Sequence, residues 1–313
     1  MVRFSIIITN YNGLSFIKDC LDSLENQIFK DFEVIFVDNN SIDNSVNFVK
    51  EHYSNVIFIL NSINRGYGGG CNDGAKASKG DYLFFLNTDT TLLPDCLLNL
   101  DEGIHLFPDY GMYAPKMIYP NGKINSTGLC ISLSGAAWDR GLGEKDIGQY
   151  DKPDEIFGPC GGAAVFKREP FLEINGFDES FFLFMEDVDI IIRMQSAGWK
   201  CRFLPHSTVV HHHGGITGVG SDFSVYYGNR NIIWNTFKNY PDYLILLAFF
   251  FIFVRNLGSI LYYGIKGRGR VVLRAKWDGI KGLPPIIRRK YSQKKGVNSF
   301  FWKKYLKIIA YRS

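Results

Sequence analysis

The stretch YLFFLNTD at residues 82 to 89 decides how the fold is read. Its apolar run stops abruptly at Asn87-Thr88-Asp89, which is typical of a buried strand that delivers Asp89 to the carboxyl edge of a sheet. In open α/β sheets this edge is where ligands bind. An Asp that merely begins a turn would explain the same residue taken alone, so the interpretation depends on the other segments.

Strand and helix patterns alternate through the first half of the chain. Hydrophobic periodicity predicts strands at 3–9, 33–37, 56–60 and 81–86, and helices at 15–27, 43–52 and 72–79. Repeated βα units predict an α/β fold with a doubly wound, mostly parallel sheet. The second half is less regular, although the turn Gly-Pro-Cys-Gly-Gly at 158–162 leads into a strand at 163–166.

Two further segments suit a phosphate-bearing ligand. Asp38 follows an apolar run and precedes a helix, where it could accept hydrogen bonds from a nucleobase or ribose or could simply begin the helix. Asn64 and Arg65 open a glycine-rich stretch that we expect to be a loop ahead of a helix, with backbone amides close to a diphosphate. The stretch matches neither the dinucleotide-binding nor the Walker A motif.

Acidic residues and imidazoles also occur at a helix start and a strand end. Glu186-Asp187-Val188-Asp189 opens a helix behind the aromatic run 181–184, which could keep water from a reacting carboxylate. His211-His212-His213 follows an apolar strand, and one of these imidazoles could complete a metal site with Asp89. Helix-capping carboxylates and a surface histidine cluster are the structural alternatives.

Charge is distributed unevenly. Residues 1–265 contain 20 Lys and Arg against 30 Asp and Glu, whereas 266–313 contain 15 Lys and Arg against Asp278 alone. The segment Tyr243 to Ile265 is apolar apart from Arg255-Asn256 and precedes the basic tail. We therefore expect it to lie in a membrane interface, or to enter the membrane and return with a turn near Arg255-Asn256. A buried core helix followed by a solvated tail is the alternative. The six scattered cysteines favour reduced thiols and a cytosolic setting.

A set of motifs in a fixed order resembles family 2 glycosyltransferases, in particular the rhamnosyltransferase-like branch. The motifs span about residues 4 to 238 and are SIIITNYNG (5–13), DNNS (38–41), NRGYGGGCNDG (64–74), LNTD (86–89), GGAAVFKRE (161–169), GFDESFFLFMEDVDIIIRMQSAGW (176–199) and VVHHHGG (209–215). The resemblance implies a GT-A fold, an inverting mechanism, a nucleotide-diphospho-sugar donor and a divalent metal, Mg²⁺ or Mn²⁺. It divides the chain into a catalytic domain at 1–238 and a membrane-associating helical tail at 239–313.

The resemblance also implies roles for individual residues. Asp187 is the expected catalytic base, Asp89 the metal-binding acid of a DxD-type motif, and His211 or His213 the imidazole that assists metal or diphosphate. Asn87 stands where the first acid of that motif is expected. The residues expected on the donor side are Thr9, Asp38, Asn64, Arg65 and Asn87, and those expected on the acceptor side are Glu186 and Asp189.

The expected partners are a dTDP- or UDP-sugar, a lipid-linked or glycan acceptor, and the cytoplasmic face of the cell membrane. Two other classes compete with this reading. A sugar nucleotidyltransferase would carry a basic, glycine-rich signature near residue 10, where this chain has Thr9-Asn10-Tyr11-Asn12. A nucleic-acid-binding protein would explain the basic tail but not the series Asp38, Asp89 and Asp187, so no nucleic-acid partner is expected.

Overall fold

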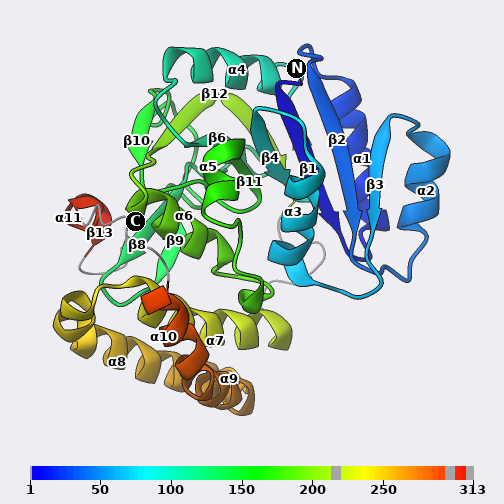
Figure 1. The fold of residues 1–313 in the computed structure, drawn as a ribbon. Helices are drawn as coiled ribbons and strands as arrows, with labels where there is room; N and C mark the ends of the chain where they lie inside the picture. The colour runs from blue at the N-terminus through cyan, green and yellow to red at the C-terminus, as the bar shows by residue number, and fades with distance from the viewer. Residues whose placement is uncertain (1, 213–219, 293–299, 308–313) are drawn as a thin grey trace.

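The computed structural model describes residues 2–212, 220–292 and 300–307. Its first half alternates strand and helix as predicted, with boundaries that shift by a few residues and one helix that begins much earlier (Figure 1). The elements are β1 (Phe4–Asn10), α1 (Leu14–Glu25), β2 (Phe32–Asp38), α2 (Ser45–His52), β3 (Val56–Leu60), α3 (Gly66–Ala77) and β4 (Tyr82–Leu86).

The second half contains short strands and the helices that surround the site. In chain order these elements are β5 (Thr90–Leu92), α4 (Cys96–Leu106), β6 (Met112–Ile118), β7 (Ile124–Ser126), β8 (Leu129–Ser132), β9 (Ala137–Asp139), β10 (Asp154–Ile156), β11 (Ala163–Lys167), α5 (Arg168–Glu173), the 3₁₀ turn η1 (Glu179–Phe181), α6 (Glu186–Ser196) and β12 (Cys201–His211). The C-terminal elements are α7 (Asp222–Asn239), α8 (Asp242–Ile265), α9 (Gly269–Lys281), α10 (Leu283–Ser292), α11 (Phe300–Tyr305) and β13 (Leu306–Lys307).

The main sheet has the order β10-β12-β6-β11-β4-β1-β2-β3, with β5 and β7 paired at its side. The four strands of the first half are parallel to one another, as the βα units predict. Beyond β4 the sheet is mixed, because β11 runs antiparallel to both β4 and β6. Strands β6 and β12 are again parallel to each other, so the fold is the α/β fold that the sequence predicts, with β11 inserted antiparallel between β4 and β6.

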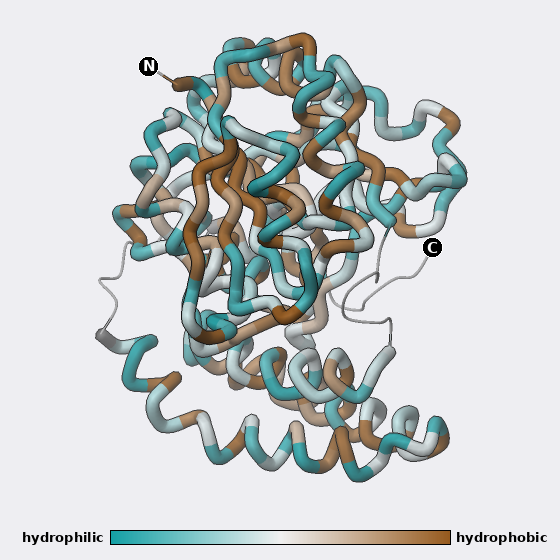
Figure 2. The backbone as a smooth tube through the Cα atoms, turned by 90° about the vertical axis from the view of Figure 1, so that its right-hand side faces the viewer, coloured by the Kyte–Doolittle hydropathy of each residue, from teal (hydrophilic) through white to brown (hydrophobic). Residues whose placement is uncertain are grey.

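Helices cover both faces of the sheet, as expected for a doubly wound α/β fold. Helices α1, α2 and α4 pack on one face and contribute to a core with Ile6, Ile8 and Phe84. Helices α3 and α6 pack on the other, in a core with Ile7 and Phe85. Hydrophobic residues accordingly concentrate on the strands at the centre of the body (Figure 2).

The glycine-rich stretch is helical, which corrects our expectation of a loop at 64–70. Helix α3 already begins at Gly66. The glycines serve close packing: a Cβ at Gly70 would lie 2.5 Å from Thr9 Cγ2, and one at Gly74 would lie 2.4 Å from Ile7 Cγ2. A helix can approach β1 this closely only if it has no side chains along the contact.

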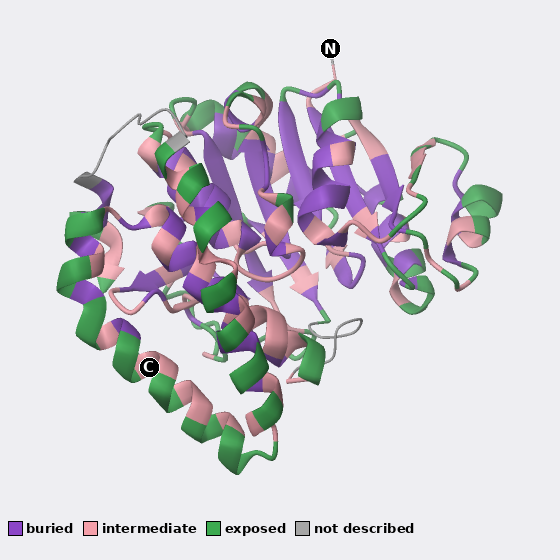
Figure 3. Cartoon of the chain, turned by 60° about the horizontal axis from the view of Figure 1, so that its bottom comes forward, coloured by how far each residue is buried: buried purple, intermediate pink, exposed green. Residues whose placement is uncertain are grey.

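The C-terminal segment forms helices beneath the α/β body (Figure 1). Helix α8 is continuous from Asp242 to Ile265, so of the two arrangements expected for this segment, the re-entrant one with a turn near Arg255-Asn256 is wrong. By length and composition it is the one described helix that could cross a membrane, and only 17% of its most apolar window is buried. Its outer side carries exposed residues along its length (Figure 3).

The chain after α8 returns to the body, so residue 238 does not separate two independently packed units. Trp234 Nε1 in α7 donates a hydrogen bond of 2.9 Å to the Gly279 carbonyl oxygen in α9. Phe301 and Trp302 are buried in the same hydrophobic cluster as Phe85 in the centre of the sheet. Basic tail residues also pair with the acidic body, which accounts for part of the charge asymmetry: Arg289 with Asp178, Lys290 with Asp242 and Lys304 with Glu155.

Candidate active site

Three neighbouring strands deliver polar residues to one edge of the sheet. Strand β1 ends at Asn10, which is directly opposite Asp38 at the end of β2. Strand β4 pairs with β1 on the other side and leads into Asn87-Thr88-Asp89. Because β1, β2 and β4 are parallel, their carboxyl ends meet, and the predicted edge site is present.

Asp38 is held by a network at this edge. Its Oδ1 accepts hydrogen bonds from Asn10 Nδ2 at 2.8 Å and Ser41 Oγ at 2.6 Å, and its Oδ2 accepts one from the Ser41 backbone N–H at 2.9 Å. The side chain is nearly buried, with 4% of the residue exposed. Thr9 lies beside this network, with its Oγ1 3.5 Å from Cys71 Sγ in α3. The network gives the Asp38 carboxylate one fixed orientation.

Asp89 and His211 form the second part of the site. Strand β12 runs antiparallel to β5, and the His212 backbone N–H donates to the Asp89 carbonyl oxygen at 2.9 Å. This pairing brings His211 Nε2 to 3.3 Å from Asp89 Oδ1. The other ring nitrogen, Nδ1, lies 2.9 Å from Asn125 Oδ1. An amide oxygen can only accept, so Nδ1 donates its proton to Asn125 and Nε2 is the ring nitrogen that faces Asp89.

The pair is suited to share a cation with a ligand. A carboxylate oxygen is a ligand for Mg²⁺ or Mn²⁺, and an imidazole nitrogen is a ligand for transition-metal ions such as Mn²⁺. Substrate phosphates complete many sites of this kind. In the described part of the chain, no cluster of three or more His, Cys, Asp or Glu side chains could enclose a metal by itself. A metal at Asp89 and His211 therefore needs further ligands from a substrate or water. His213 lies outside the described residues.

Gly161 and Gly162 connect this pair to the predicted base. The Asn87 backbone N–H donates to the Gly162 carbonyl oxygen at 3.0 Å. A Cβ on Gly162 would lie 3.3 Å from His211 Cε1 and 3.5 Å from Asn87 Nδ2. The preceding residue, Gly161, donates its backbone N–H to Asp187 Oδ2 at 3.3 Å. The structure thus brings Asn87, Asp89, His211 and Asp187 together around one two-residue segment.

Asp187 lies in the first turn of α6 with an unusual electrostatic environment. Burial raises the pKa of Asp187 to about 6, although hydrogen bonds from the Val188 and Gly161 backbone N–H groups oppose the shift. Burial and the Asp187 charge together raise the pKa of Glu186 as well. Glu186 is 5% exposed, and its Oε2 has no hydrogen-bond partner within the described residues. Both carboxyl groups therefore hold a proton more tightly than in water, which makes the Asp187 carboxylate more basic than an ordinary Asp.

Two residues that we assigned to ligands have other partners. Asp189, expected on the acceptor side, is completely buried, with Oδ2 2.8 Å from Arg193 Nε and Oδ1 2.7 Å from Lys238 Nζ. Because a buried carboxylate between two cations is not accessible to an acceptor, we correct its role to a structural one. Arg65, expected on the donor side, pairs with Asp73 and Glu179.

Asn64 lies at the start of the same helix as Arg65. Its Oδ1 accepts a hydrogen bond from the Gly66 backbone N–H at 2.9 Å, so it supports the first turn of α3. Glu186, the other residue expected on the acceptor side, lies near α3, because its carboxylate, when ionised, would raise the pKa values of Tyr67 and Cys71. Both observations put these side chains next to the helix that carries the glycine run.

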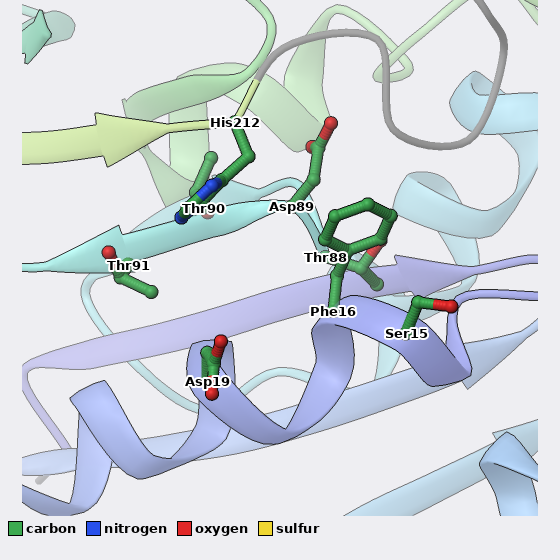
Figure 4. Close-up of a pocket in the computed structure, with 8 residues that line it drawn as sticks. All are labelled: Ser15, Phe16, Asp19, Thr88, Asp89, Thr90, Thr91 and His212. Atoms are coloured by element: carbon green, nitrogen blue, oxygen red, sulfur yellow. The ribbon is translucent and has the colours of Figure 1, made fainter. Parts of the chain in front are cut away.

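A shallow pocket opens beside Asp89 and includes residues that the sequence did not single out. Figure 4 shows Asp89 and His212 on one side of this pocket and the first turns of α1 on the other. The lining residues are Ser15, Phe16, Asp19, Thr88, Asp89, Thr90, Thr91 and His212. Asn125, which orients His211, was also missed, because a single Asn near a short strand has no distinctive sequence pattern.

Comparisons with known proteins identify the family of the chain. The model of the family described as glycosyl transferase family 2 matches residues 5–174, and that of the N-terminal domain of galactosyltransferase matches residues 145–214. The N-acetylglucosaminyl-diphospho-decaprenol L-rhamnosyltransferase of Mycobacterium tuberculosis strain H37Rv is 24% identical over 238 residues, which cover 68% of this chain and 77% of the relative.

A second relative and one solved structure extend the comparison. The GalNAc(5)-diNAcBac-PP-undecaprenol beta-1,3-glucosyltransferase of Campylobacter jejuni is 27% identical over 191 residues, which cover 58% of this chain and 57% of the relative. The fold is similar to that of the mannosyltransferase PcManGT from Pyrobaculum calidifontis, solved with GDP-Man and Mn²⁺. That match has a TM-score of 0.57 at 15% identity and covers 96% of this chain and 88% of the other.

Proposed function

The chain belongs to glycosyl transferase family 2, and from that premise we propose that it is an inverting enzyme that moves a sugar from a nucleotide-diphospho-sugar to a hydroxyl group of a lipid-linked acceptor. One observation carries the proposal: the pair Asp89 and His211 is joined through Gly161 and Gly162 to the half-buried Asp187. A transferase of this kind needs a site that binds diphosphate and, beside it, a base for the acceptor hydroxyl.

On the donor side, Asp38 would accept hydrogen bonds from the nucleoside, and Thr9 and Asn87 line the same edge of the sheet. Asp89 and His211 would hold a divalent metal, Mn²⁺ or Mg²⁺, which neutralises charge on the departing diphosphate when it is bound. Arg65 and Asn64 stand at the start of α3, and Arg65 would have to exchange its carboxylate partners to reach a phosphate.

Asp187 would act as the base. The acceptor oxygen forms a bond to the anomeric carbon, the bond from that carbon to the diphosphate oxygen breaks with its electron pair, and the hydroxyl proton passes to an Asp187 carboxylate oxygen. Burial makes this carboxylate more basic than an ordinary Asp while leaving it ionised at neutral pH. Burial and the neighbouring Asp187 charge raise the pKa of Glu186 as well, which disfavours a second negative charge beside the base.

The names of two relatives support a proposal for the acceptor and the sugar. One acts on a decaprenol-linked acceptor as a rhamnosyltransferase, and the other is named for an undecaprenol-linked acceptor and a glucosyl group. We propose a polyprenyl-diphosphate-linked acceptor in cell-surface glycan synthesis, with rhamnose from a dTDP-sugar as the leading donor and a UDP-sugar as the alternative.

The C-terminal helices support a location at the cytoplasmic membrane surface. The exposed side of α8 carries Leu246, Phe250, Phe253, Leu257 and Leu261, which are 46% to 78% exposed. Helix α9 beside it exposes the apolar residues Leu273, Trp277 and Ile280, together with Arg270, Arg274 and Lys281. An apolar face bordered by cations is typical of segments that lie in an anionic bilayer interface.

The packing of α9 favours the interfacial arrangement over a membrane crossing. Helix α7 precedes α8, and α9 follows it, yet Tyr226 in α7 donates a hydrogen bond of 2.8 Å to Asp278 in α9. A single crossing by α8 would put these two residues on opposite sides of the bilayer. With α8 flat in the interface, the body and the tail both stay on the side that contains sugar nucleotides, which we take to be the cytoplasm.

A thermal-shift panel of nucleotide sugars, each with and without Mn²⁺, tests the donor class. We expect one dTDP- or UDP-sugar to raise the melting temperature only with the metal present, and the Asp89→Ala variant to lose that rise. A rise that the metal does not affect would count against the metal assignment. A salt-sensitive response to DNA with none to any sugar nucleotide would favour the nucleic-acid alternative.

A further inference from the structure

The segment that leads into Asp187 has a conformation that needs external support. Phe182, Phe184 and Met185 have φ values of 67°, 66° and 69°, in the left-handed region that side chains other than Gly rarely adopt. Asp187 follows two residues later, at the start of α6. Residues in this region persist only where surrounding contacts over-determine them, and they cluster at functional sites.

Asn231 in α7 supplies much of that support. Its side-chain amide is completely buried and lies 2.8 Å from each of three backbone carbonyl oxygens, those of Phe181, Leu183 and Phe184. An amide has two N–H groups, so at least one of them is shared between carbonyls. The Phe182 carbonyl points the other way and accepts the Tyr67 backbone N–H of α3 at 2.8 Å.

Arg230 fixes the orientation of the Asn231 amide. Its Nε donates to Asn231 Oδ1 at 2.8 Å, which turns the amide nitrogen toward the loop. Its Nη2 donates to the Phe181 carbonyl oxygen at 2.9 Å. The guanidinium in turn lies over the rings of Trp234 and Tyr227, at 4.1 Å and 4.6 Å from their centroids.

Lys238, further along α7, holds the residues on either side of the loop. Its buried Nζ lies 2.7 Å from Asp178 Oδ2 and 2.7 Å from Asp189 Oδ1. Side chains of α7 therefore contact the residues before the left-handed segment, the segment itself and the residues after it. Arg230, Asn231 and Lys238 are not among the residues proposed to bind metal or donor. Their contacts therefore act on the conformation of the segment that precedes Asp187.

We infer that Asn231 is a positioning residue, which holds the backbone of residues 181–184 from α7 and thereby sets the location of the Asp187 carboxylate. The inference rests on the proposed role of Asp187 as the base. Helix α7 also links the proposed membrane face to the base segment, because it contacts α9 through Trp234 and Gly279.

Asn231→Leu tests the inference, since it keeps the side-chain size and removes the donors. Asn229→Leu is the matched control: Asn229 is also buried in α7, but its amide bonds only the Val225 carbonyl of its own helix. We expect Asn231→Leu to lower kcat about tenfold or more, with donor affinity by calorimetry within about twofold of the parent. Asn229→Leu should change kcat by less than about threefold.

A pH profile separates positioning from general destabilisation. Because burial is the main cause of the raised pKa of Asp187, a loosened segment should admit water and move the acid limb of the kcat profile to lower pH in Asn231→Leu. A kcat equal to that of Asn229→Leu, or an unmoved acid limb, would overturn the inference.

Two further variants keep the outcome unambiguous. If Asn231→Leu does not fold, Arg230→Lys decides, because it keeps the charge but removes the Nε and Nη2 donors; an unchanged kcat there would overturn the inference. Asp187→Asn is measured in parallel. If Asp187→Asn keeps full turnover, the proposed base is wrong, whereas loss in Asp187→Asn with none in Asn231→Leu refutes only the positioning role.

Discussion

His211 Nε2 lies 3.3 Å from Asp89 Oδ1 because β12 and β5 pair in a register that sets His211 opposite Thr90. The proximity of His211 and Asp89 is therefore set by strand pairing in the sheet. We expect Asp89→Ala to abolish metal-dependent donor binding, since Asn87 cannot replace the lost carboxylate. Calorimetry with the donor and Mn²⁺ checks this. Asp95→Ala is the control, because Asp95 is exposed and its side chain makes no capping hydrogen bond at α4; this variant should bind donor and Mn²⁺ as the parent does. If Asp89→Ala also binds them as the parent does, Asp89 is not a metal ligand.

Asn125 gives a second test of the same site. Its Oδ1 accepts the His211 Nδ1 proton at 2.9 Å and so presents Nε2 to the metal position. Asn125→Ala should weaken Mn²⁺ and donor binding by about 10- to 100-fold, which is typical when the partner of a metal-ligating His is removed. Mn²⁺ titration followed by electron paramagnetic resonance measures this directly. Unchanged affinity would mean that His211 is not a ligand.

The pH dependence follows from the raised pKa of Asp187. Proton abstraction needs the ionised form, so kcat should rise with pH through about 6 and approach a plateau near neutral pH. The same shift makes the ionised carboxylate unfavourable in the folded state. This cost is absent below about pH 4, grows between about pH 4 and pH 6, stays constant at higher pH, and is removed in Asp187→Asn. That variant should melt at a higher temperature than the parent at pH 7.5 and close to it at pH 4. An acid limb near pH 4 would contradict the buried base.

The membrane face can be tested with charges on α8. Removing the whole tail is unsuitable, because Tyr240, Leu244, Phe301 and Trp302 belong to the hydrophobic core of the body. The double variant Phe250→Glu/Leu257→Glu should keep the fold, since both residues are exposed, and should lose flotation with vesicles that contain phosphatidylglycerol. Leu106→Glu is the control, because Leu106 is an exposed residue at the end of α4; this variant should float as the parent does. If the double variant floats as well as the parent, the exposed side of α8 is not the membrane-binding surface.

Much of the first half could be predicted from sequence. Strong apolar runs and helical periodicity located β1 to β4 and α1 to α3, and the strand-end positions of Asp38 and Asp89 followed from that order. The glycine run misled us, because glycines that permit close packing of α3 on Thr9 and Ile7 look the same in a sequence as glycines of a loop.

The remaining errors concern pairings between distant segments. Asp189 and Lys238 are far apart in sequence, so nothing near Asp189 indicated that a cation from α7 would bury it. The support of the base segment by Asn231 was invisible for the same reason. The continuous course of α8 through Arg255-Asn256 shows that a polar pair inside an apolar run does not by itself predict a turn.

The most direct test of the account is the turnover of Asp187→Asn in a transfer assay with the donor found by the thermal-shift panel and a polyprenyl-diphosphate-linked acceptor. The amide keeps the shape of the carboxylate but cannot take the proton, so kcat should fall by roughly 10² or more while donor affinity stays the same. Glu186→Gln should lose much less, because burial and the Asp187 charge raise the pKa of Glu186 and already disfavour its ionised form. Near-parental turnover by Asp187→Asn would contradict the account and move the base to another residue.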